Sequence, residues 1–179
     1  INTACASCTQ VGQVDINNAV TGDLNSNRNR TLTMNANGDI NVNQSITLAS
    51  SASSDINYTT HSLELNSTNG NINLLATVRT QPYSTNNAVG TAYYSGSITL
   101  SAVNGTISST SAGVINAGGY NATSSANSQY AGSINISARN INISSAITSS
   151  SNKGDASFGG DITIATTNTV VDGSNVGVS

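Results

Sequence analysis

Short stretches of the chain alternate between aliphatic and small polar residues, and this alternation predicts β-strands. The clearest cases are Ile98-Thr-Leu100, Ile134-Asn-Ile136 and Ile162-Thr-Ile164. Successive side chains of a strand point to opposite faces, so the aliphatic residues are expected on a buried face and Thr or Asn on a solvated one. Apolar spacings of three and four residues, which are typical of helices, are not sustained along the sequence.

Each of these stretches belongs to a unit that the sequence repeats. A glycine stands two residues before the first isoleucine of each strand, and an aromatic residue stands two residues before each glycine: Tyr94 and Gly96, Tyr130 and Gly132, Phe158 and Gly160. Related segments begin at Gly38 and Gly70. One such unit cannot bury its aliphatic face alone, whereas copies stacked on one another can. The glycines are expected at corners where backbones approach closely or φ is positive.

The repeat predicts an all-β fold, a parallel β-helix (β-solenoid) with about three short strands per coil. In one copy the three strands are expected at Ser133–Ser137, Asn140–Ser144 and Ala146–Thr148. With coils of about 20 residues stacked at the ~4.8 Å strand spacing, the chain would form a rod of roughly 40 Å. The outward Asn, Thr and Ser side chains are expected to hydrogen-bond from coil to coil.

A β-sandwich is the alternative fold, since Asn-Gly pairs such as Asn37-Gly38 and Asn69-Gly70 are typical of hairpin turns. The solenoid is favoured because stacking requires similar strands to recur, and a sandwich does not. Residues 31–179 are predicted to form this single solenoid. Residues 1–30 are predicted to be a less regular N-terminal segment that carries the two cysteines.

The spacing between copies is uneven, and the extra residues fall after the third strand, so loops are expected at one corner of the solenoid. Most of the aromatic residues lie in these segments. Tyr94, Tyr130 and Phe158 keep a fixed offset from glycine and are interpreted as structural residues that pack in register at the corner. Tyr83, Tyr93 and Tyr120 lack that offset and are the candidate residues for contact with a glycan or another partner.

Composition narrows the classes of function. Only 7% of residues are charged, the net charge is −3, and the five basic residues are scattered, so a nucleic-acid partner is not expected. No apolar run approaches the ~20 residues that would insert into a membrane. The chain starts at Ile1 without methionine or a signal-like segment, which is compatible with export as a processed protein or as part of a longer one. An extracellular or cell-surface location is therefore predicted.

The residues that commonly carry chemistry do not form a recognisable site in the sequence. Cys5 and Cys8 lack the further ligands of a zinc site or the following histidine of a haem site, and a local disulfide is expected, with free or interchain thiols as the alternatives. Asp39, Asp55 and Asp161 each precede a predicted buried isoleucine and are interpreted as solvated turn residues. No catalytic residue, metal or cofactor is predicted.

Segments such as Gly96-Ser-Ile-Thr-Leu-Ser-Ala102 and Gly160-Asp-Ile-Thr-Ile-Ala165 resemble the shaft repeats of filamentous-haemagglutinin-type bacterial exoproteins. The resemblance is best over residues 38–179 and implies a secreted protein that folds as a right-handed parallel β-helix and acts as a long adhesive fibre. It predicts a structural or adhesive segment, with the rest of a longer fibre, another copy or cell-surface glycans as partners. The alternatives are a filament subunit that stacks or exchanges strands end to end and, less favoured, a carbohydrate-active β-helix enzyme.

Overall fold

The computed structural model describes residues 12–22, 30–48, 57–80, 92–119, 128–151 and 157–167. Within these ranges the regular elements are all β-strands. The same ranges contain no helix with the length and hydrophobicity needed to cross a membrane.

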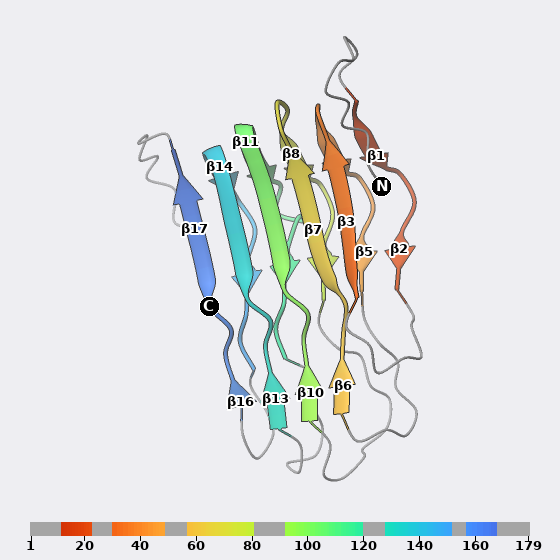
Figure 1. Cartoon of the computed structure of the whole chain (residues 1–179), viewed down its shortest axis with the longest axis vertical. Coiled ribbons are helices and arrows are strands. Elements are labelled where there is room, and N and C mark those ends of the chain that lie inside the picture. The colour runs from red at the N-terminus through yellow and green to blue at the C-terminus, as the bar shows by residue number, and fades with distance from the viewer. Residues whose placement is uncertain are drawn as a thin grey trace.

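The strands stack coil upon coil in four rows, and every pairing between them is parallel (Figure 1). The first row is β3 (Thr31–Ala36), β7 (Ser62–Ser67), the start of β11 (Ile98–Ser109), the start of β14 (Ile134–Ile143) and β17 (Ile162–Thr166). The second row is β1 (Val14–Ile16), β4 (Ile40–Val42), β8 (Ile72–Leu74) and the ends of β11 and β14. These two rows form one eight-stranded sheet.

The other two rows are separate sheets of shorter strands. The third row is β2 (Val20–Thr21), β5 (Ile46–Thr47), β9 (Val78–Arg79), β12 (Ile115–Asn116) and β15 (Ile147–Thr148). The fourth row is β6 (Asn57–Thr59), β10 (Ala92–Tyr94), β13 (Ser128–Tyr130) and β16 (Ser157–Phe158).

The predicted parallel β-solenoid is confirmed, and the β-sandwich is excluded because sandwich hairpins would pair antiparallel. The three predicted strands of each coil correspond to the first three rows, although β11 and β14 each run through two of them. The Asn-Gly pairs are corner residues whose side chains stack: Asn69 donates a hydrogen bond to Asn37 (2.7 Å), and Asn104 donates one to Asn69 (3.0 Å). The fourth row is a strand that the sequence interpretation missed.

The coils are longer than expected. Ile98 pairs with Ile134, 36 residues later, and Ile134 pairs with Ile162, 28 residues later. The estimate of about 20 residues is wrong because the fourth strand and the connection before it add to each coil. Since the first row contains five strands, its height is about 19 Å at the ~4.8 Å strand spacing, well short of the expected rod.

The solenoid also begins earlier than residue 31. Val14 pairs with Ile40 and Val20 pairs with Ile46, so β1 and β2 already belong to the stack. Cys5 and Cys8, with their predicted disulfide, lie outside the described residues.

Glycine forms two separate columns, a column being the set of side-chain positions that stack from coil to coil. Gly70 precedes a second-row strand, whereas Gly96, Gly132 and Gly160 precede first-row strands, so the sequence interpretation wrongly treated them as copies of one position. A Cβ on Gly132 would lie 2.1 Å from the carbonyl oxygen of Gly96. These glycines are therefore required by close approach of one backbone to the next.

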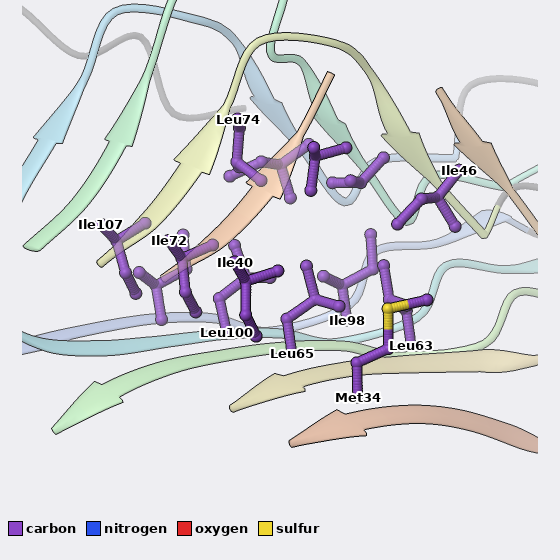
Figure 2. Close-up of a cluster of buried hydrophobic side chains, with 14 of the residues drawn as sticks. Met34, Ile40, Ile46, Leu63, Leu65, Ile72, Leu74, Ile98, Leu100 and Ile107 are labelled. Atoms are coloured by element: carbon purple, nitrogen blue, oxygen red, sulfur yellow. The ribbon is translucent and has the colours of Figure 1, made fainter. Parts of the chain in front are cut away.

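The hydrophobic core is a set of aliphatic columns that face one another between the sheets (Figure 2). Leu65, Leu100 and Ile136 follow one another in the first row and are at most 1% exposed. Full burial of such a side chain contributes roughly 1.5–3 kcal/mol, and stacking supplies it only where a coil lies on each side.

Polar side chains stack along the outside, as predicted. In the second row Asn41 donates a hydrogen bond to Asp15 (2.7 Å), Asn73 donates to Asn41 (2.7 Å), and Ser108 donates to Asn73 (2.9 Å). The hydrogen bonds from Asn41 and from Gln13 hold the pKa of Asp15 below its usual value. The ladder links successive coils on the solvated face.

Each coil closes where the third row meets the glycine of the following coil. Thr80 donates a hydrogen bond through Oγ1 to the Gly96 carbonyl, and the Gly96 amide donates to Thr60 Oγ1. The Gly160 amide likewise donates to the Ser149 carbonyl (2.9 Å), while Ser149 Oγ donates to the carbonyl of Gly132, the glycine at the start of its own coil. These contacts fix the end of the third row against the glycines that precede the first row.

Candidate functional site

The aromatic residues of the repeat lie in the fourth row, one above another. Tyr94 pairs with Tyr130, and Tyr130 pairs with Phe158. Thr59 is opposite Tyr94 in the preceding coil, so it continues this column without a ring. Because the strands are parallel and in register, the same side of each strand presents the same position of the repeat.

The three rings form a continuous stack. The ring centroids of Tyr94 and Tyr130 are 4.5 Å apart with the planes 8° from parallel, and those of Tyr130 and Phe158 are 4.7 Å apart and 4° from parallel. These separations are close to the ~4.8 Å spacing of the strands that carry the rings. The prediction that these aromatics pack in register along the axis is confirmed.

The aromatic stack, defined by Tyr94, Tyr130 and Phe158, lies at the surface. Tyr94 is 37% exposed and Phe158 is 48% exposed, while Tyr130 between them is partly buried. In such a stack each ring covers the face of its neighbour, so the surface consists of ring edges. Aromatic rings that bind a flat sugar use their faces, and both faces of Tyr130 are covered by its neighbours in the stack.

Tyr93 occupies the alternate position and points inward. The sequence predicts it to be a contact residue, but it is only 1% exposed, because neighbouring residues of a strand face opposite sides. Gln129 pairs with Tyr93 in the next coil and is fully buried. The other two predicted contact residues, Tyr83 and Tyr120, lie outside the described residues.

His61 is a buried residue that the sequence interpretation did not place. It stands where later coils have Gly96 and Gly132, because Leu63 pairs with Ile98 two positions further on. Its Nδ1 accepts a hydrogen bond from the Arg30 amide (3.0 Å), and its Nε2 has no hydrogen-bond partner among the described residues. Burial, followed by the charge of Arg30, lowers the pKa of His61, so the ring is neutral and structural.

The two described candidate carboxylates, Asp39 and Asp161, do not meet. Asp39 precedes β4 in the second row, where it accepts a hydrogen bond from the Asn71 amide (2.7 Å), and Asp161 precedes β17 in the first row. Asp55 lies outside the described ranges. The part of the chain that the structure describes contains no group of three or more His, Cys, Asp or Glu side chains arranged to hold a metal ion.

The most distinctive part of the described surface is the aromatic stack, which offers apolar ring edges and the tyrosine hydroxyls along the solenoid axis. The fixed offset between each aromatic residue and the following glycine predicted the aromatic stack from the sequence. The buried position of His61 could have been predicted from its alignment with the glycine column, which the sequence interpretation overlooked. Comparison with known proteins found no matching family model, no similar curated protein and no similar solved structure.

Proposed function

We propose that the chain is a shaft segment of an extracellular fibrous protein of the adhesive type, with the aromatic stack as a contact strip along one side. The observation that supports a shaft is the parallel register of the first row, which continues through successive coils. First-row pairing runs from Leu32 to Leu63, Ile98, Ile134 and Ile162 without a change of residue class.

A segment of this kind adds length by repeating one interface. Each coil contributes about 4.8 Å of height, and the closure at Thr80 and Ser149 keeps the coil geometry independent of the corner connections. The low charge and the outward ladders of amides and hydroxyls suit a protein that stays hydrated without strong long-range electrostatic attraction.

The location can be tested with an antibody raised against the chain and applied to intact cells of the organism that makes it. Gold labelling along fibres that project from the cell surface is expected. Labelling that appears only after the cells are permeabilised would contradict an extracellular shaft.

The contact strip is tested by coating beads with the chain and measuring adhesion to cells. Replacing Tyr94, Tyr130 and Phe158 by Ser is expected to reduce adhesion. The matched control replaces Thr47 and Thr148, outward residues of the third row, by Ser and should adhere like the unaltered chain. Equal adhesion of all three proteins would leave the stack with a packing role only.

The enzyme alternative has a direct test as well. Polysaccharide substrates are incubated with the chain and with an Asp39→Asn, Asp161→Asn variant, and new reducing ends are measured. We expect no depolymerisation by either protein. Activity that depends on these carboxylates would replace the shaft proposal.

A further inference from the structure

We propose that the outer edge of β16 and β17, with which no described strand pairs, is an assembly edge that accepts a further coil of this repeat from outside the 179 residues. The incoming segment would be a parallel strand with the pattern aromatic-x-Gly-x-aliphatic-x-aliphatic. This inference rests on the proposed shaft function and names the partner that the end of the shaft would take. β16 and β17 lie at one end of their rows (Figure 1).

The first-row aliphatic column that ends at Ile164 is open at this end. Leu65 and Leu100 are fully buried and Ile136 is 1% exposed, whereas Ile164, which continues their column in β17, is 43% exposed. The aromatic column ends in the same way, since Phe158 stacks on Tyr130 with one face and no other described ring covers its second face. An edge strand with aliphatic residues and free backbone groups is a template for another strand.

The opposite end of the solenoid differs. Val14 and Ile16 belong to the first second-row strand, and Met34 belongs to the first strand of the first row. None of these three side chains is more than 8% exposed, although no described strand pairs with the outer edge of β1 or β3. Addition of a coil is therefore favoured at the β16 and β17 end only.

The residues that follow β17 within the sequence are too few to fill this edge with a parallel strand. Thirteen residues, from Thr167 to Ser179, follow Thr166. The shortest return from one coil to the next among the described pairs is 26 residues, between Asp15 and Asn41. A parallel strand on β17 must therefore come from another coil.

The existing interfaces define what that coil must carry. Ile162 and Ile164 require aliphatic residues opposite them, as Ile134 and Ile136 provide on the other side of β17. The incoming residue opposite Gly160 must also be glycine. In the equivalent contact inside the stack, a Cβ added to Gly160 would lie 2.3 Å from the Gly132 carbonyl oxygen. Phe158 favours an aromatic ring. Recognition would combine backbone hydrogen bonds with side-chain pockets, as in other strand-addition complexes.

The test uses a fluorescent peptide of residues 128–138, which carries this pattern, and measures its binding to the full chain by anisotropy. Saturable binding is expected. A control peptide of the same composition, in which both isoleucines move one position toward the N-terminus, should bind at least tenfold more weakly, because a one-residue slip turns the aliphatic residues to the opposite face.

Two variants of the protein locate the binding edge. Ile164→Asn is expected to weaken peptide binding at least tenfold, whereas Val103→Asn should leave it unchanged, since Val103 is 60% exposed but lies within β11. Circular dichroism checks that both variants are folded, and Phe158→Ser serves as a second edge variant if Ile164→Asn is not.

Absence of binding, or equal binding of the slipped peptide, would overturn the proposal. The proposal would also be overturned if analytical ultracentrifugation showed a dimer of the unaltered chain that the Ile164→Asn variant does not form. In that case a second copy of the same edge would cover β16 and β17. These outcomes are independent of the cell-surface labelling that tests the shaft itself, so the two proposals can fail separately.

Discussion

The middle of the stack and its C-terminal end carry the same motif but bury it to very different extents. Leu100 in the central coil is fully buried, and Ile164 in the last described coil, two levels along the same column, is 43% exposed. The local sequence is equivalent, so the difference comes from the number of neighbouring coils. In a repeat structure of this kind a motif stabilises the fold in proportion to the interfaces on either side of it.

The largest expected effect on stability comes from shortening the aliphatic side chains of Leu100 and Ile164, which belong to the same first-row column. Leu100→Ala should lower the free energy of unfolding by about 2–5 kcal/mol, because the cavity lies between two fixed coils. Ile164→Ala should cost clearly less, since part of the side chain is already in water. Urea unfolding measures both, and equal losses would mean that the end is covered in solution.

The second effect concerns backbone contact between coils. A Cβ on Gly105 would lie 1.8 Å from the Gly70 carbonyl oxygen, so Gly105→Ala should cost about 1–3 kcal/mol or more by forcing two central coils apart. Gly159→Ala near the end is the matched control, since its Cβ would lie at an ordinary van der Waals distance of 3.5 Å from the Ser149 carbonyl oxygen. Thermal unfolding of the two variants should separate them, and similar melting temperatures would contradict the close approach.

The third effect tests the aromatic stack. Tyr130 has a ring on both faces, whereas Phe158 has a described ring on one, and an aromatic pair contributes about 0.5–1.5 kcal/mol. Tyr130→Leu should therefore destabilise the chain about twice as much as Phe158→Leu. A larger loss for Phe158→Leu in urea unfolding would show that the end ring has a partner of its own.

The smallest effect is a pH dependence in an early coil. Burial lowers the folded-state pKa of His61, so its contribution to stability is complete above the unfolded-state pKa of about 6.5 and is lost as the pH falls from there through the folded-state pKa. His61→Asn keeps an acceptor for the Arg30 amide and removes the titration. The difference in melting temperature between pH 7 and pH 5 should shrink in this variant, and an unchanged difference would assign the dependence to other groups.

The alternation of aliphatic and polar residues was sufficient to predict the first three strands of the coils that begin at Gly96 and Gly132, because those strands have a buried and a solvated face. It did not predict β1 and β2, which lie in the segment expected to be less regular. It could not predict the fourth row, whose Tyr93-Tyr94, Gln129-Tyr130 and Ser157-Phe158 lack an aliphatic alternation. In the fourth row the side chain that is buried depends on how the strand is oriented at the corner of the coil. Tyr93 therefore lies inside, although the sequence interpretation expected it outside.

The register between coils is the second feature that could not be predicted from the sequence. Gly70 and Gly96 begin similar phrases, yet they lie at different corners, since the pairing partner of each strand is about 30 residues away and local sequence does not specify it. The same long-range alignment places His61 in a glycine column and separates Asp39 from Asp161. The aromatic stack could be anticipated because its offset from glycine is constant, while its exposure could not.

The ratio between the length of a coil and its height has a mechanical consequence. The coil from Ile98 to Ile134 holds 36 residues, which would extend to about 120 Å if pulled straight, yet it adds only about 4.8 Å to the stack. A tether built from such coils would lengthen by roughly twenty-five times the height of each coil that unwinds. Under tension the least supported coil would yield first, so the structure would dissipate a sudden load in steps before its attachment broke.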